Sequence, residues 1–279
     1  MGGRDFPVVR VSVVTMTLFL VAALLIRSFV RQRMIDRGID ATAAEHLSAL
    51  FGFAVLGLLA GPVVAPWHRQ IISMFRRPRS WPRTLLSGLA LGLCLRLASW
   101  AGAIMPLAFG WGGLAPPGQG GAPSVWFACP SIAKLALILV VMSLVTPIVE
   151  EVLHRGLIFG AMLTKGPTAA VLFSAALFAL VHDASTAPVA FFAGMFLAIQ
   201  YWHFKSLWAP LITHATFNVC AIADSVCLQT AWRPEAVSDS MLAFGAGAVL
   251  LAVAAMAGAI WFSAFAPVGA NRVGPPRPE

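Results

Sequence analysis

Long apolar runs constrain what this chain can fold into more than any other feature. The runs are about 17–25 residues long, which is the length that a helix needs to cross a bilayer. A backbone in lipid must satisfy its own hydrogen bonds, so such runs predict helices. Only 11% of the 279 residues are charged, against roughly 25% in soluble domains. We therefore predict an all-α, polytopic membrane protein of about eight transmembrane helices.

The predicted spans are residues 11–27, 47–66, 84–108, 131–160, 168–183, 188–203, 207–224 and 241–266. The first span has a basic flank like that of a signal peptide. It ends in Ile26-Arg27 without a small-residue cleavage pattern, so we predict a retained anchor. The chain divides into N-terminal helices and loops (1–130), a core (131–224), a C-terminal helix (225–266) and a disordered tail (267–279).

The basic residues indicate a membrane orientation. A net charge of +8 would favour nucleic acid in a soluble chain, but here the Lys and Arg residues cluster in loops. With the N-terminus inside, the inner segments hold Arg4, Arg10, Arg69, Arg76, Arg77, Arg79, Arg83, Arg155, Lys165, Lys205, Arg272 and Arg277, and the outer ones hold Arg27, Arg31, Arg33, Arg37, Lys134 and Arg233. The excess of Lys and Arg in the inner segments predicts an integral protein of a bacterial inner membrane, with both termini cytoplasmic and no nucleic-acid partner. The main exception is the cluster 27–37, although Asp36, Asp40 and Glu45 lie in it or just after it.

Two adjacent acids stand out because they lie well inside a predicted span. Ionisable groups at that depth are functional candidates, and the alternative is a structural ion pair. Glu151 and Arg155 have the i, i+4 order that favours a pair, whereas Glu150 points about 100° away and has His154 four residues on. Pro147 is expected to kink or loosen this helix, which would let water and an extended peptide enter.

Two further polar pairs follow on apolar helices. Phe178 and His182 are i and i+4, and so are His214 and Asn218, so each pair shares one helical face. A lone histidine in a membrane is more often a satisfied helix–helix hydrogen bond than a catalyst. Two histidines on different helices, with an asparagine and a spare carboxylate, favour a common site. At about 1.5 Å of rise per residue, three helices can bring these side chains to a similar depth inside the helix bundle.

The ordered set EExxxR (150–155), FxxxH (178–182) and HxxxN (214–218) resembles the CPBP intramembrane protease family, which includes the type II CAAX prenyl endopeptidases and bacteriocin-processing proteins. The resemblance covers about residues 131–224, which makes this segment the protease core. His154 departs from the family pattern, which usually has an aromatic residue before the arginine. The departure concerns substrate fit more than chemistry.

The resemblance implies an intramembrane endopeptidase of the glutamate type with its active site inside the bundle. The substrate would be a membrane-anchored or lipidated protein, either a prenylated CAAX protein or a sorting tail, and membrane lipids would be its other partners. Glu150 and His182 would activate a water molecule, and His214 and Asn218 would stabilise the oxyanion. Glu151, Arg155 and Phe178 would support these four catalytic residues.

Other mechanisms and functions stay open at this point. Glu150, His182 and His214 could bind zinc as a His₂Glu set, although no HExxH motif supports it. We favour metal-independent chemistry with no required cofactor. A proton-coupled transporter would also retain intramembrane Glu and His, and it would account best for Arg96 in the third span. A non-catalytic immunity or scaffold protein is the remaining alternative.

Two of the four cysteines are candidates for a disulfide. Cys129 and Cys227 lie at the predicted outer face, where an oxidising compartment would let them pair. The alternative is two unrelated free thiols. Cys94 and Cys220 fall inside spans, where we expect reduced thiols that behave as small apolar groups.

Overall fold

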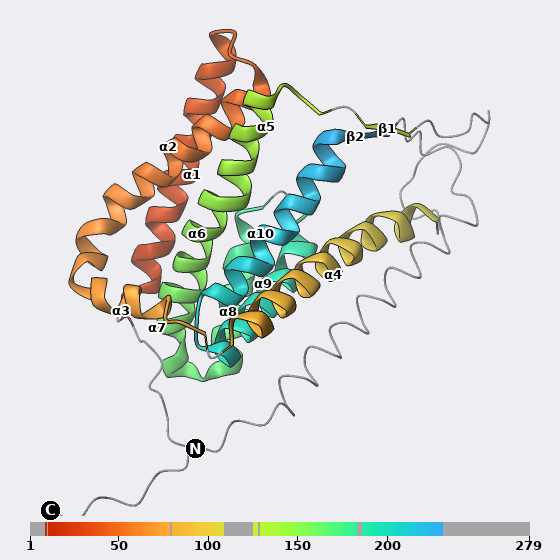
Figure 1. Ribbon diagram of the computed structural model, residues 1–279. Coiled ribbons are helices and arrows are strands. Elements are labelled where there is room, and N and C mark those ends of the chain that lie inside the picture. Colours follow the sequence, from red (N-terminus) through yellow and green to blue (C-terminus); the bar gives the residue numbers. More distant parts are fainter. Residues whose placement is uncertain are drawn as a thin grey trace, which may run out of the picture.

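The computed structural model describes residues 9, 11–78, 80–108, 125–127, 129–182 and 186–230. These residues are almost entirely helical, as the sequence predicts (Figure 1). One short antiparallel pair was not predicted: β1 (Val125–Phe127) pairs with β2 (Leu228–Thr230). The predicted span 241–266 and the predicted disordered tail 267–279 lie outside the described residues.

The N-terminal half opens with a helical hairpin. It comprises α1 (Val13–Asp36) and α2 (Ala41–Val64), which continues through η1 (Ala65–Trp67) into α3 (His68–Met74). Gly38 turns the chain with a φ of 80°, and Asp40 caps α2 by accepting a hydrogen bond from the backbone of Ala43 at 3.1 Å. Helix α1 runs past its predicted end at residue 27. It can do so because Arg27 and Arg31 both pair with Glu45 of α2, so the basic residues are partly neutralised within the hairpin.

A single long helix crosses the middle of the molecule, drawn in green in Figure 1. It comprises α5 (Ile132–Leu139), η2 (Val140–Val145), α6 (Thr146–Glu151), η3 (Val152–Phe159), α7 (Gly160–Met162) and η4 (Leu163–Lys165). Segments η2 and η3 are π-helical, so the two acids lie between two wide turns. Proline 147 has no N–H to donate, and the wider winding before it carries Thr146 N–H to the carbonyl of Val141. The predicted loosening at Pro147 is therefore a π-helical turn.

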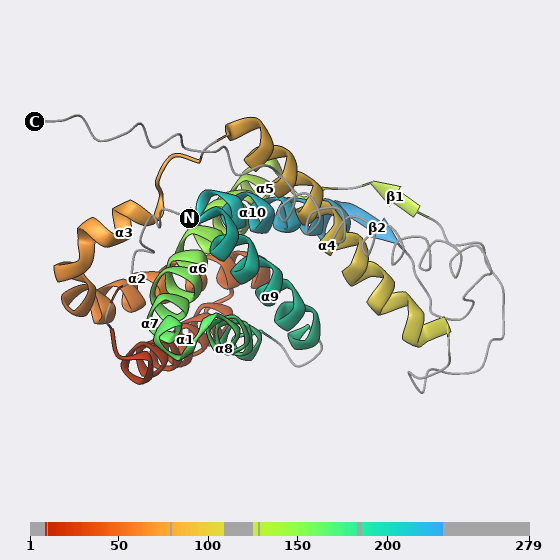
Figure 2. The ribbon, with the colours of Figure 1, turned by 90° about the horizontal axis from the view of Figure 1, so that it is seen from below.

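The remaining described helices complete the bundle. They are α4 (Trp81–Ala108), α8 (Pro167–Leu180), α9 (Ala187–Phe204), and α10 (Trp208–Ile222), which is extended by η5 (Ala223–Cys227). Helix α8 packs on α9, and α10 packs on α4 (Figures 1 and 2). The contact between α4 and α10 depends on Gly92, where an added Cβ would lie 2.6 Å from the carbonyl oxygen of Thr213.

Four of the described helices are long and apolar enough to cross a membrane: Val13–Asp36, Ala41–Met74, Ile132–Lys165 and Ala187–Phe204. Helix α8 is apolar but shorter. Large apolar side chains are exposed on the outside of the bundle, among them Leu58, Ile132 and Leu180, as expected where lipid replaces water. The protein is an integral membrane protein. Within the described ranges, however, only four of the eight predicted spans are long and apolar enough to cross a membrane.

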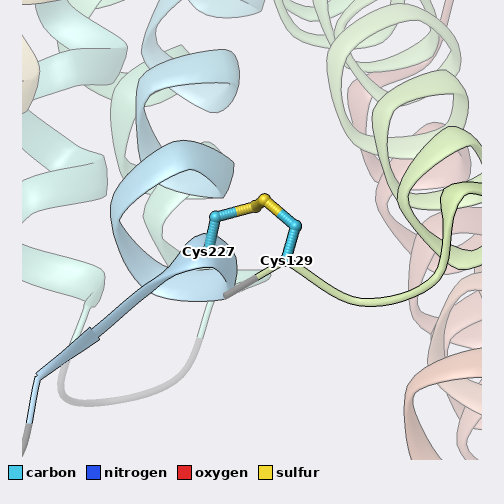
Figure 3. Close-up of a disulfide and its surroundings, with 2 residues drawn as sticks. All are labelled: Cys129 and Cys227. Atoms are coloured by element: carbon cyan, nitrogen blue, oxygen red, sulfur yellow. A yellow bond between two sulfur atoms is a disulfide. The ribbon is translucent and has the colours of Figure 1, made fainter. Parts of the chain in front are cut away.

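A disulfide between Cys129 and Cys227 joins the start of the long helix to the end of η5 (Figure 3). The two Cα atoms are 4.1 Å apart, so of the two alternatives that the sequence left open, a disulfide or free thiols, the structure has the disulfide. Cys94 and Cys220 are free thiols, as predicted. We call this end of the bundle, which also holds the α1–α2 turn, the disulfide end. Lys134 and Asp40 pair there at 3.1 Å, and this contact lowers the pKa of the Asp40 carboxyl.

Candidate active site

A buried ion pair forms the base of the candidate site. Arg155 Nη1 lies 3.2 Å from Glu151 Oε1, and both side chains are sealed from solvent. The same guanidinium donates through Nη2 to the carbonyl oxygen of Gly194 on α9, at 3.2 Å. The i, i+4 pair predicted from the sequence is present, and it also anchors the long helix to α9.

His214 of α10 lies between the two adjacent carboxylates. Its Nδ1 is 2.8 Å from Glu151 Oε1, and its Nε2 is 3.8 Å from Glu150 Oε2. The Glu150 side chain remains 17% exposed, whereas that of Glu151 is 1% exposed. One carboxylate is therefore held by a guanidinium and an imidazole, whereas its neighbour is partly exposed.

The Phe178 ring is the centre around which the other side chains gather. Its centroid lies 5.3 Å from that of His154, 4.8 Å from that of His182 and 5.7 Å from that of His214. Arg155 Cζ is 4.5 Å from the same centroid, within the range of a cation–π contact. Phe178, expected from the sequence to support the catalytic residues, thus contacts His182 and three more polar side chains.

Backbone carbonyls orient two of the imidazoles. His182 Nδ1 lies 2.7 Å from the carbonyl oxygen of Phe178, and His154 Nδ1 lies 3.0 Å from that of Glu150. A carbonyl can only accept, so each Nδ1 carries the hydrogen, and in a neutral ring Nε2 is then an acceptor. His154 thus contacts the Glu150 backbone, and its fully buried Nε2 has no hydrogen-bond partner.

Asn218 holds α10 against the π-helical turn η2. Its Nδ2 donates to the carbonyl oxygen of Met142 at 2.6 Å, which leaves one hydrogen of the amide group for another acceptor. The structure therefore brings Glu150, Glu151, His154, Arg155, Phe178 and His214 together, with His182 against Phe178. Asn218 lies one turn beyond His214 on α10 and contacts the long helix at Met142.

Three supporting contacts were not predicted, because they use backbone atoms or small side chains. Ser174 Oγ donates to the carbonyl oxygen of His154 at 2.9 Å, and the carbonyls of Gly194 and Met142 accept from Arg155 and Asn218. At Gly194 an added Cβ would lie 3.1 Å from Ala175 Cα and 3.3 Å from Phe178 Cδ1. Any residue can supply a carbonyl, so no side-chain pattern marks these positions.

The residues proposed as zinc ligands do not form a metal cluster in this arrangement. Among the described side chains, no group of three or more His, Cys, Asp and Glu residues is placed to hold one ion. Glu150 and His214 are near each other, and the bond of His214 Nδ1 to Glu151 leaves Nε2 as the ring nitrogen that faces Glu150. We therefore derive no catalytic step through a metal.

Arg96, the residue that best fitted the transporter alternative, lies on the α4 side of the bundle. Its Cζ is 5.6 Å from the ring centroid of Phe217 on α10, and its Nη1 is 3.4 Å from Ser99 Oγ. Arg155, and not Arg96, is the residue that forms the ion pair with Glu151.

Comparison with known proteins places similarity in the segment that holds this site. Residues 132–220 match a family model described as "Type II CAAX prenyl endopeptidase Rce1-like". A curated protein of Bacillus subtilis (strain 168), named "Putative membrane peptidase YdiL", is 32% identical over 93 residues, which are 33% of this chain and 38% of that protein. The match spans less than half of that relative's length. No solved structure matches the chain.

Proposed function

We propose that this chain, whose residues 132–220 match the type II CAAX prenyl endopeptidase model, is an intramembrane endopeptidase of the glutamate type. The observation that carries the proposal is the difference in surroundings between two adjacent carboxylates. Glu151 is buried against Arg155 and His214, whereas Glu150 has no guanidinium partner among the described residues and stays partly exposed. A partly exposed carboxylate without a guanidinium partner, inside an apolar bundle, is the kind of group that a water-activating base requires.

In the proposed mechanism, Glu150 accepts a proton from the attacking water. The unprotonated Nε2 of His182 accepts a second hydrogen bond from the same water and orients it, since its Nδ1 is held by the Phe178 carbonyl. The resulting hydroxide adds to the carbonyl carbon of the scissile bond. The proton taken up by Glu150 then passes to the leaving amine. Base catalysis of this kind is worth roughly 10²–10⁴ in rate.

The oxyanion of the tetrahedral intermediate would be stabilised from α10. Glu151 fixes the plane of the His214 ring by accepting from Nδ1, so Nε2 faces the Glu150 side of the site. When Nε2 is protonated it can donate to the oxyanion, and Glu151 compensates the charge of the imidazolium. The second hydrogen of the Asn218 amide supplies another donor. Loss of one such donor typically costs about 10²–10³ in rate.

The substrate class follows from where the site lies. Glu150 and His214 lie between helices of a membrane bundle, so a peptide bond must reach them from a chain that is itself held at the membrane. A prenylated CAAX protein or a membrane-anchored sorting tail meets this requirement. We also propose that the disulfide end faces an oxidising compartment, because the Cys129–Cys227 bond needs one, and the excess of Lys and Arg toward the opposite side agrees.

The test compares new protein N-termini in membranes that contain the wild-type protein, Glu150→Gln or Asp36→Asn. Asp36 is an exposed acid on α1 that bonds to Gln32, so its variant removes the same charge far from the site. We expect a set of N-termini that appears with the wild type and Asp36→Asn and is missing with Glu150→Gln. Identical sets for the wild type and Glu150→Gln would contradict the proposal and favour a non-catalytic scaffold.

A further inference from the structure

The basic cluster 27–37 at the disulfide end is only half neutralised. Arg27 and Arg31 share the carboxylate of Glu45. Part of this cluster, which runs against the predicted orientation, is therefore neutralised inside the protein. Asp40, the next acid, is occupied by Lys134. No ion pair joins Arg33 or Arg37 to a carboxylate within the described ranges. Two guanidiniums thus remain at the end of α1.

These two guanidiniums line the same pocket. It has a volume of about 590 Å³, and its walls are Phe29, Val30, Arg33, Met34, Arg37 and Ile39. Gly38, with its φ of 80°, reverses the chain so that Ile39 closes the pocket against the last turns of α1. Arg33 Cζ lies 5.2 Å from the Phe29 ring centroid, which places one guanidinium over an aromatic wall. The pocket is therefore apolar with two positive charges.

An apolar ridge leads along α1 into this pocket. The ridge comprises Val14, Leu18, Val21, Leu25 and Phe29, which are 47–69% exposed. Their spacing of three or four residues puts them on one face of the helix, and Arg33 continues the same face. The acidic side chain nearest in sequence, Asp36, bonds to Gln32 through Oδ1 and is not part of the pocket. One helix face thus offers an acyl-chain surface that ends in two cations.

We propose that this ridge and pocket bind an anionic phospholipid, with its phosphate on Arg33 and Arg37 and an acyl chain along α1. Guanidiniums bind phosphate oxygens through paired hydrogen bonds, and membrane-surface cations attract anionic lipids. A second copy of this chain fits the ridge less well. All copies insert in the same orientation, so a two-fold dimer through this face would set Arg33 against Arg33 of the other copy.

The test uses the purified full-length protein in detergent and native mass spectrometry. Dioleoylphosphatidylglycerol is titrated against dioleoylphosphatidylcholine, which has the same chains and no net charge. The test variant is Arg33→Gln with Arg37→Gln. The matched control is Arg69→Gln with Arg77→Gln, which removes two exposed charges from the opposite end of the bundle. Single variants at Arg33 and Arg37 provide folded intermediates if the double variant is unstable, and the thermal midpoint of each variant is measured first.

We expect the wild type and the control to bind phosphatidylglycerol at least tenfold more tightly than the double variant, a difference of about 1.4 kcal/mol. Each single variant should fall between them. Equal phosphatidylglycerol binding by the wild type and the single variants would overturn the proposal. So would phosphatidylcholine binding as tight as phosphatidylglycerol binding, or a dimer that Leu25→Ala dissociates. The site is separate from Glu150, so none of these outcomes bears on the proposed peptidase.

Discussion

At the scale of single residues, two neighbouring glutamates have opposite surroundings, and their variants should separate chemistry from stability. Glu150→Gln removes the proposed base and leaves the buried Arg155 pair intact, so cleavage should fall by at least about 10² with an unchanged thermal midpoint. Glu151→Gln leaves Arg155 buried without its counter-charge. Such a loss costs roughly 3–5 kcal/mol, so folded protein should decrease as well.

The measurements are the cleavage rate and the thermal midpoint of each purified variant, with Asp36→Asn as the control for charge. His182→Ala and His214→Ala should also abolish cleavage. His214→Ala should in addition lower the thermal midpoint more than His182→Ala does, because the His214 side chain contacts Glu151. Full activity of purified Glu150→Gln would refute Glu150 as the base. A Glu151→Gln variant as stable as the wild type would refute the structural role of the pair.

The zinc alternative is tested on the same residues. The proposed mechanism uses Glu150 and His182 to activate the water without a metal, so we expect a strong chelator to leave cleavage by the wild-type protein unchanged. The measurement is activity after dialysis against chelator, with metal content determined in parallel. Inhibition that added zinc reverses would favour the His₂Glu mechanism instead.

At the scale of helices, the position of α10 depends on how closely α4 approaches it. An alanine at Gly92 would place its Cβ 2.6 Å from the Thr213 carbonyl oxygen and 2.7 Å from Thr216 Cβ, so α10 must move. We expect Gly92→Ala to cost about 1–3 kcal/mol in stability. Cleavage should fall by up to about 10², because α10 carries His214 and Asn218.

Gly57 of α2 is the matched control for this substitution. An added Cβ there meets nothing within 4 Å, and alanine favours a helix more than glycine does. Gly57→Ala should therefore leave cleavage unchanged and keep or raise the thermal midpoint. If Gly92→Ala behaves like Gly57→Ala in both measurements, the close contact between α4 and α10 does not position the site.

The helices and the polar pairs could be predicted because both follow from local spacing. Apolar runs locate helices, and i, i+4 spacing put Glu151 with Arg155. The contact of His214 with Glu151, rather than with Glu150 alone, could not be predicted, since it depends on the rotation of α10 about its axis. The π-helical turns around the acids, the β1–β2 pair and the carbonyl of Gly194 likewise depend on packing between distant segments.

At the scale of the whole molecule, the disulfide should stabilise the helices that carry the site. A disulfide typically stabilises a fold by about 2–4 kcal/mol, and by more when the closed loop is long, and this one spans 98 positions. Cys129→Ser with Cys227→Ser should therefore lower the thermal midpoint. Dithiothreitol should lower that of the wild type and have little effect on the double variant, and Cys220→Ser serves as a control that keeps the bond.

Mass spectrometry of protein that has never been exposed to a reductant tests the same bond and the proposed orientation of the disulfide end. Peptides that contain Cys129 and Cys227 should appear cross-linked, and neither thiol should be alkylated in intact cells. Complete alkylation of both positions would show that the bond does not form in the membrane and would remove this support for the orientation.

The same bond also makes residues 129–227 a covalent macrocycle with two tails. Residues 132–220, which match the family model, lie within the ring, and so does every proposed catalytic side chain. A single cut inside the ring, for example in the exposed turn near Gly166, would leave both pieces linked until the disulfide is reduced. A cut between α4 and Cys129 would instead release α1 to α4 as a separate polypeptide. Those helices are joined to the ring covalently at one peptide bond and otherwise by noncovalent contacts, such as the Lys134–Asp40 ion pair and the hydrogen bond from Trp208 Nε1 to the Phe75 carbonyl oxygen.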